Sequence, residues 1–191
     1  MKLAIVSTTI HNEKGYLPFD KLAKKSSFSD VIFVISGDKK TPSFDTGSFQ
    51  CEVEYLSVKD QEKYKCSKPM GWNKIMRRNT ALLRALELKP DFMLIIDDDN
   101  IPQDDYFDLW YKTITNPVDK IVISKNNESD PCWHNYLKTS DADIEIYPRG
   151  FPIEFRGKYS TEIVSTPVSI PNEKVGLYQG ISLGDPDIDA I

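Results

Sequence analysis

The stretch that most constrains this chain is residues 92–100, which read Phe-Met-Leu-Ile-Ile-Asp-Asp-Asp-Asn. Its first five residues are apolar, which is too few for a membrane span and is typical of a central strand buried on both faces of a sheet. Because the side chains of a strand alternate, we expect Asp97 and Asp99 to project to one side and Asp98 to the other.

The position of these carboxylates suggests a metal site. Ligands of open α/β sheets bind just beyond the carboxyl ends of the strands. Two carboxylates on one side of a strand repel each other unless a cation lies between them, and a divalent metal that carries a phosphate ester meets this need. Asp97 and Asp99 are therefore predicted metal ligands. Two other interpretations stay open: a solvated acidic loop, and a calcium site that only stiffens the fold.

Length and composition predict one globular domain over residues 1–191. Hydrophobic residues make up 40% of the chain, which is enough for a core, and the 28% of charged residues and the net charge of −5 do not indicate disorder. The acidic balance disfavours nucleic acid and anionic membranes as partners. Cys51, Cys66 and Cys132 are widely spaced, which favours reduced thiols over disulfides or a zinc site. Since no apolar run reaches membrane length, we expect a soluble, cytoplasmic protein.

The first part of the chain predicts parallel strands joined by helices. An apolar strand at residues 3–6 turns polar at Ser7, Thr8 and Thr9, and a second strand at residues 31–35 ends in Ser36-Gly37-Asp38. A short helix is expected within residues 12–25. This order indicates right-handed βαβ units and a mainly parallel sheet flanked by helices, an α/β fold.

Further elements follow on both sides of the aspartates. Residues 51–58 predict a half-buried edge strand, and residues 121–124 and 144–147 predict short strands. A helix over residues 73–88 is expected to start at Asn73 as its N-cap. Its predicted apolar face consists of Ile75, Met76, Asn79, Leu82, Leu83 and Leu86. A later helix, starting at Pro102, is expected to bury Tyr106, Phe107, Leu109, Trp110 and Ile114.

Arg77 and Arg78 lie early in the first of these predicted helices, on the approach to the aspartates. Arginine suits bidentate binding of phosphate, so both residues are candidate contacts of a diphosphate. The alternative is a pair of solvated side chains.

Several short motifs together resemble known families. They are Thr9-Ile10-His11-Asn12, Ser36-Gly37-Asp38, Ile96-Asp97-Asp98-Asp99, Tyr147-Pro148-Arg149-Gly150-Phe151-Pro152 with Arg156-Gly157, and Gly184-Asp185-Pro186-Asp187-Ile188-Asp189-Ala190-Ile191. In this order the set resembles the plant reversibly glycosylated polypeptides, which include UDP-arabinopyranose mutases. The last two patches are also similar to STELLO-type glycosyltransferases. The resemblance implies a Rossmann-like GT-A fold, a nucleotide-sugar donor with UDP as the expected nucleotide, and Mn²⁺ or Mg²⁺. Because these families continue beyond the last motif, it also implies a shortened chain or a minimal member.

The resemblance assigns roles to particular residues. Thr8, Thr9 and Asp38 are expected to line the nucleoside, and Arg78 to contact the phosphates. The other predicted substrate-binding residues are Asp98, Arg156 and Asp185. Asp187 and Asp189 are the catalytic candidates near the end of the chain, where a carboxylate in such an enzyme completes the metal shell or acts as the base for an acceptor hydroxyl.

Arg149 matches the arginine that becomes glycosylated in the mutase-like proteins. A guanidinium stays protonated and is a poor nucleophile, so a second possibility is that Arg149 grips the diphosphate or the sugar through a bidentate contact. Both possibilities remain open at this point.

The expected function is that of a metal-dependent glycosyltransferase that acts on an unidentified acceptor. The first alternative is a mutase that interconverts pyranose and furanose forms of a nucleotide sugar. The second is a non-catalytic nucleotide-sugar-binding protein. A nucleotidyltransferase is disfavoured, because no glycine-rich phosphate loop follows the first strand.

Overall fold

The computed structural model describes residues 1–124, 147, 152–156, 163–171 and 175–177. The chain forms two compact units, Met1–Thr113 and Ile114–Ile191, and each is described by itself. The single domain expected over residues 1–191 stays a prediction.

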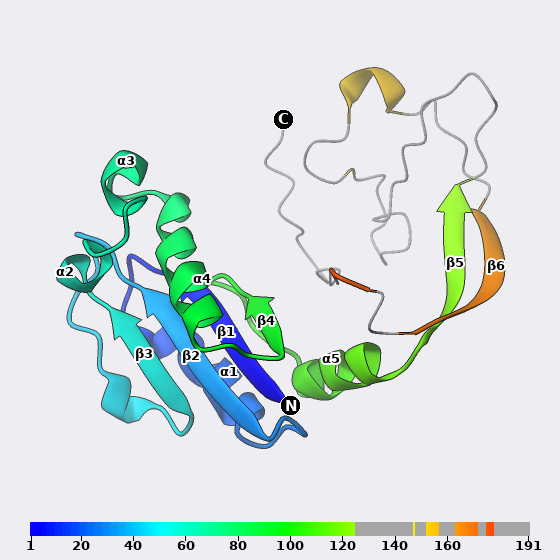
Figure 1. Cartoon of the computed structure of the whole chain (residues 1–191), viewed down its shortest axis with the longest axis horizontal. Coiled ribbons are helices and arrows are strands. Elements are labelled where there is room, and N and C mark those ends of the chain that lie inside the picture. Colours follow the sequence, from blue (N-terminus) through cyan, green and yellow to red (C-terminus); the bar gives the residue numbers. More distant parts are fainter. Residues whose placement is uncertain (125–146, 148–151, 157–162, 172–174, 178–191) are drawn as a thin grey trace. The chain divides into compact units, whose positions relative to one another are not determined.

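The first unit is built on a four-stranded sheet in the order β3-β2-β1-β4 (Figure 1). All neighbouring strands are parallel, which confirms the α/β class and the mainly parallel sheet. The finer GT-A assignment remains a prediction. The strands are β1 (Lys2–Thr8), β2 (Asp30–Ser36), β3 (Glu52–Leu56) and β4 (Phe92–Ile95).

Helices cover the two faces of this sheet. Helix α1 (Leu17–Ala23) follows a 3₁₀ turn at Glu13–Tyr16, as predicted within residues 12–25, and buries Phe19 almost completely. It lies on the face opposite to α4 (Arg78–Glu87) (Figure 1). On the α4 side the core consists of Ala4, Val6, Ile32, Val34, Leu56, Ala81 and Ala85.

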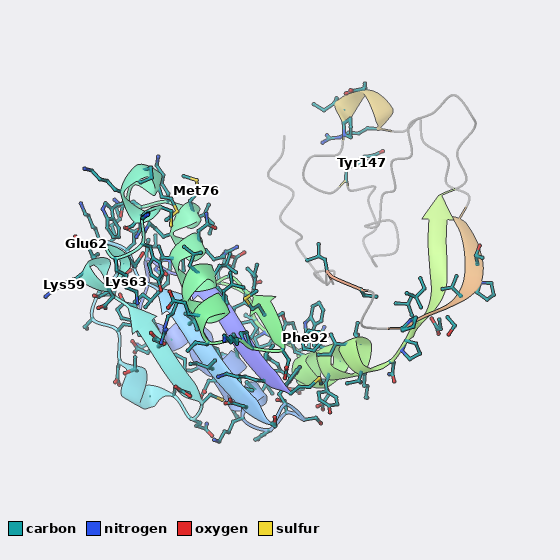
Figure 2. The ribbon with its side chains drawn as sticks, in the orientation of Figure 1. Lys59, Glu62, Lys63, Met76, Phe92 and Tyr147 are labelled. Atoms are coloured by element: carbon teal, nitrogen blue, oxygen red, sulfur yellow. The ribbon has the colours of Figure 1, made fainter. Side chains whose placement is uncertain are left out.

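The prediction for the helix after residue 73 was wrong at its start and on its face. Helix α4 begins at Arg78 after a 3₁₀ turn, and Asn73 is not its N-cap but has a left-handed backbone with φ of 57°. Most side chains expected inside are outside: Ile75 is 62%, Met76 44% (Figure 2), Leu83 38% and Leu86 55% exposed. Leu82 is partly buried against the core, as predicted. The helix packs closely on β1 and β2, so that small side chains face the sheet.

The central strand expected at residues 92–96 does not have a central position among the described strands. Among the described strands β4, which begins at Phe92 (Figure 2), is an outer strand that pairs with β1 alone. Met93 and Ile95 are consequently 42% and 50% exposed. At the other edge, β3 confirms the half-buried edge strand predicted within residues 51–58.

Three further helices are described. They are α2 (Val58–Gln61) and α3 (Ser67–Met70), which have four residues each, and α5 (Tyr106–Thr115), which has ten. Helix α5 begins four residues later than the predicted start at Pro102 and buries Phe107 and Ile114, but Leu109 is 49% exposed, contrary to expectation. Within the described part of the chain, no helix combines the length and the apolar character needed to cross a membrane.

In the second unit, β5 (Val118–Ser124) pairs antiparallel with β6 (Ile163–Ile170). Strand β5 confirms the strand predicted at residues 121–124. Of the strand predicted at residues 144–147, only Tyr147 belongs to the described residues.

Candidate functional site

The candidate site lies at the carboxyl edge of the parallel sheet, where β1, β2 and β4 continue into polar segments. Backbone hydrogen bonds hold these segments side by side. The Thr9 N–H donates to the Ser36 carbonyl at 3.0 Å, and the Ile96 N–H donates to the Val6 carbonyl at 3.2 Å. The Ser7 hydroxyl also donates to the Ile96 carbonyl at 2.8 Å. In open α/β sheets this edge is where ligands bind.

The two threonines after β1 differ in their surroundings. The Thr8 hydroxyl donates to the Ser36 carbonyl at 2.8 Å, and its side chain is only partly buried. Thr9 is 3% exposed, and its hydroxyl donates to the carboxylate of Asp98 while it accepts the His11 N–H at 2.9 Å. Thr9 therefore ties the end of β1 to the end of β4, whereas Thr8 lies closer to the surface.

Asp98 lies apart from Asp97 and Asp99, as predicted, but the cause is a turn after the strand and not the alternation of side chains along it. Strand β4 ends at Ile95, and the chain turns at Asp98 and Asp99. Asp98 is half-buried against Thr9, whereas Asp97 and Asp99 are exposed. The outward-facing carboxylates are thus the two predicted to bind metal.

Arg78 brings positive charge to this edge. Its guanidinium forms an ion pair with Asp97 from the first residue of α4. Its Nε is buried and has no hydrogen-bond partner among the described residues. Burial lowers the pKa of Arg78, while the nearby Tyr16 and Asp98 act in the opposite direction. The Nε of Arg78 is therefore an enclosed donor that lacks a partner on the described part of the chain.

The donor set restricts the kind of metal site that is possible here. Within the described ranges, no group of three or more His, Cys, Asp or Glu side chains could hold a metal. Mg²⁺ sites often use only one or two carboxylates and complete the shell with water and substrate phosphates. Asp97 and Asp99 are exposed carboxylates of the type that such a site uses.

Gly15 and Tyr16 support the site, although no pattern in the sequence predicted a role for them. The Tyr16 side chain is fully buried, and its hydroxyl donates to Ser7 Oγ at 3.0 Å. Burial raises the pKa of Tyr16, and the negative charge of Asp98 raises it further. Gly15 lies directly against the backbone carbonyl of Asp98, where a Cβ atom would collide. Together they support the turn that carries the aspartates.

Asp38 follows β2 and is 5% exposed. Its Oδ1 accepts the Lys39 N–H at 2.6 Å, and its Oδ2 accepts the Asn73 N–H at 2.7 Å. The Asp38 N–H donates to Thr41 Oγ1 at 2.7 Å, and that hydroxyl donates to the Thr9 carbonyl at 2.6 Å. A continuous series of hydrogen bonds therefore joins Asp38, through Thr41 and Thr9, to Asp98.

Arg77 behaves differently from either interpretation of the sequence. It is neither solvated nor available to a diphosphate, because its side chain is fully buried. The sequence pair Arg77-Arg78 thus divides into one internal and one partly exposed guanidinium.

The other predicted residues belong to the second unit. The guanidinium of Arg156 lies 5.3 Å from the ring centroid of Tyr147, a cation–π contact, and its Nε has no hydrogen-bond partner within the described residues. Arg149, Asp185, Asp187 and Asp189 lie outside the described residues.

The structure therefore brings seven of the predicted site residues to one edge of the first unit, namely Thr8, Thr9, Asp38, Arg78, Asp97, Asp98 and Asp99. No protein-family model matches the sequence, and no curated protein is significantly similar to it.

Proposed function

We propose that the protein is a metal-dependent glycosyltransferase that binds a nucleoside-diphosphate sugar at the carboxyl edge of its parallel sheet. The observation that carries the proposal is the hydrogen-bonded series from Asp38 through Thr9 to Asp98, next to the Arg78–Asp97 ion pair. A nucleoside diphosphate with its metal requires three kinds of group: a carboxylate for the nucleoside, a cation for the phosphates and carboxylates for the metal. Asp38, Arg78 and the pair Asp97 and Asp99 are proposed for these roles.

In this proposal Thr8 and Asp38 contact the nucleoside, and Arg78 contacts the diphosphate. Because the side chain of Arg78 is partly exposed, its guanidinium can turn from Asp97 to a phosphate oxygen. Asp97 and Asp99 would hold Mn²⁺ or Mg²⁺. Bound there, the ion would supply Lewis-acid stabilisation for the negative charge on the departing diphosphate.

Arg78 and Asp97 neutralise each other when no ligand is bound. On ligand binding, a phosphate would pair with Arg78 in place of Asp97, and the metal would pair with Asp97 in place of Arg78. Both exchanges keep opposite charges together at the half-exposed edge, so ligand binding leaves neither group without a counter-charge.

The transfer itself breaks the bond between the anomeric carbon and the diphosphate oxygen and forms a bond from that carbon to an acceptor oxygen. The acceptor proton then needs a base. Asp187 and Asp189 are the proposed candidates, and Arg149 is proposed to contact the diphosphate or the sugar. UDP is the expected nucleotide because of the family resemblance.

A thermal-shift screen of UDP sugars, with and without Mn²⁺, tests this proposal. A ligand that binds only the folded protein raises the melting temperature, with a stabilisation of about 2.7 kcal/mol at a concentration of 100 times Kd. Asp99→Ala is expected to remove the metal-dependent part of the shift. Asp104→Ala is the matched control, because Asp104 is also exposed and lies five residues further along the chain.

The outcomes separate the alternatives. If no nucleotide sugar shifts the melting temperature of the wild-type protein, the proposed function is wrong. If the shift in Asp99→Ala equals that in Asp104→Ala, the metal assignment is wrong. Release of free nucleotide that depends on an acceptor indicates a transferase, ring interconversion with the nucleotide sugar retained indicates a mutase, and binding without either indicates a binding protein.

A further inference from the structure

Arg77 is a fully buried cation that the proposed reaction does not use. Its Nε donates to Gln61 Oε1 at 2.9 Å, and its Nη1 donates to the carbonyls of Ser67 and Gly71 at 2.9 and 3.3 Å. Its Nη2 donates to Ser67 Oγ at 2.9 Å and also to Gln61 Oε1. Every guanidinium N–H is thus bonded to a neutral oxygen, and Arg77 forms no ion pair within the described part of the chain.

Burying a charged side chain only to fill space in the core is unfavourable in free energy. Removing a guanidinium from water is unfavourable, and an apolar side chain of similar volume often serves a core equally well. Burial accordingly lowers the pKa of Arg77. An apolar side chain cannot orient several oxygen atoms at once, whereas Arg77 does. The groups to which Arg77 donates therefore indicate its role.

The first of these groups leads to the backbone before Asp38. Gln61 is the only residue of its short helix that is fully buried, while Lys59, Glu62 and Lys63 around it are exposed (Figure 2). The Gln61 Nε2 donates to the Gly37 carbonyl at 2.7 Å and to the Leu56 carbonyl at 2.9 Å. Arg77 thereby orients the amide that holds the peptide immediately before Asp38.

The second group leads to the carboxylate of Asp38. Arg77 binds the carbonyl of Gly71, and its guanidinium lies 3.8 Å from the ring centroid of Trp72. The next residue, Asn73, has the left-handed backbone that turns its N–H towards Asp38 Oδ2, at 2.7 Å. A left-handed backbone is unusual for a residue other than glycine and persists where its surroundings impose it.

We infer that Arg77 is a positioning residue for the nucleoside end of the site. It holds both Gly37 and the turn at residues 71–73, and these two segments set the position and direction of the Asp38 carboxylate. The inference rests on the proposed function, because it names Asp38 as the group whose orientation distinguishes a nucleoside diphosphate from a bare diphosphate. Each Asp38 oxygen accepts one N–H bond and keeps a second lone pair for a ligand hydroxyl or N–H.

The test compares two probes in the presence of Mn²⁺: UDP, which has a nucleoside, and pyrophosphate, which has none. Arg77→Lys keeps the charge but loses the planar fork that binds Gln61 and Ser67 together. By calorimetry we expect it to weaken UDP binding about tenfold, the loss of one charge-assisted hydrogen bond, and to leave pyrophosphate binding unchanged. Arg84→Lys is the matched control, since Arg84 lies on α4, the helix that directly follows Arg77, but pairs with Glu54 and Glu87.

A double-mutant cycle separates positioning from general damage. On an Asp38→Ala background, Arg77→Lys is expected to have no further effect on UDP affinity, because the group that it positions is gone. An equal loss of UDP and pyrophosphate binding, or an undiminished effect on the Asp38→Ala background, would overturn the inference. If Arg77→Lys does not fold, Trp72→Leu removes the stacking platform instead, and the same selective loss of UDP binding is expected.

Amide hydrogen exchange distinguishes failure of this inference from failure of the proposed function. Arg77→Lys is expected to speed exchange at Asn73 while leaving Leu88, whose N–H bonds to the Arg84 carbonyl at 3.3 Å, unchanged. If the wild-type protein binds neither probe, the proposed function fails, and the exchange rate at Asn73 still decides the structural claim. An unchanged rate at Asn73 shows that Arg77 does not position this turn.

Discussion

Among single residues, Gly15 is the one whose missing side chain matters most to the candidate site. Its backbone lies against the Asp98 carbonyl, so that a Cβ atom would collide with main-chain atoms that have few ways to move. Tyr16, the next residue, supports the same region through its hydroxyl bond to Ser7. The position of the aspartate turn thus depends on two residues that carry no functional group towards a ligand.

Gly15→Ala is expected to lower the free energy of unfolding by about 1–3 kcal/mol, the usual cost of overpacking. Gly176→Ala is the matched control, because a Cβ atom there meets no atom of the described residues within 4 Å. Its expected effect is within about 0.5 kcal/mol. Denaturant titration of both variants measures the difference, and equal stabilities would contradict the close contact between Gly15 and Asp98.

Cys51 provides a prediction on pH dependence. Burial, with Asp20 nearby, raises the pKa of its thiol to about 12. Since the thiolate is the reactive form, alkylation by iodoacetamide at pH 8 is expected to be roughly 10³-fold slower in the native than in the unfolded protein, where the pKa is about 8.5. The native rate should rise tenfold per pH unit towards pH 12, as followed by mass spectrometry of the Cys51 peptide.

The same shift has a consequence for stability with a definite sign. Between about pH 8.5 and 12 the folded protein keeps a proton on Cys51 that the unfolded protein has lost, so stability falls as pH rises through this window. Equal alkylation rates in the native and unfolded proteins would contradict the burial of this thiol.

At the scale of the element, helix α4 joins the sheet to the site. Ala81 and Ala85 let it approach β1 and β2, and its first residue, Arg78, then reaches Asp97 beyond the end of β4. Larger residues on that face would move the helix away from the sheet and Arg78 with it. The small side chains therefore determine where the positive charge lies.

Ala81→Leu is expected to destabilise the protein by about 1–3 kcal/mol, because the added atoms have no space between the helix and the sheet. Leu86→Ala is the contrasting variant, since Leu86 is 55% exposed and alanine is at least as good a helix former. Its expected effect is within about 0.5 kcal/mol. Thermal and denaturant unfolding of the two variants test which face is buried. A larger loss of stability in Leu86→Ala than in Ala81→Leu would show that the face predicted from the sequence is the buried one.

For the molecule as a whole, the division into two units separates the predicted residues into two sets. Apart from Arg149, the proposed contacts of the nucleoside, diphosphate and metal lie in the first unit, whose sheet has helices on both faces (Figure 1). Arg149, Arg156 and the aspartates near the end of the chain lie in the second. Binding of the nucleotide and transfer of the sugar are therefore expected to be separable.

A chain of residues 1–115, which keeps α5 entire, is expected to fold cooperatively and to retain the thermal shift caused by UDP with Mn²⁺. It is expected to lose turnover, which needs the proposed catalytic residues of the second unit. Circular dichroism establishes folding, and the full-length chain is the control for the shift. A folded fragment without any shift would contradict the assignment of binding to the first unit.

The sequence alone was sufficient for those features that depend on residues near each other in the chain. Apolar runs ending in polar residues predicted β1 and β2, and alternating apolar side chains predicted the half-buried β3. The alternation of strands with helices predicted the parallel sheet. The apolar strand before the aspartates predicted a ligand site at Asp97 and Asp99, whereas Thr8, Thr9 and Asp38 were expected at that site through the family resemblance.

The tertiary structure decided what depends on distance between elements. A helical pattern shows two faces, but the spacing between α4 and the sheet selected Ala81 and Ala85 as the buried ones. The bond from Thr9 to Asp98 joins residues 89 positions apart, and the buried position of Arg77 depends on Gln61 and Ser67 from other segments. Local patterns carry no record of such partners, because these contacts form only when distant segments pack together.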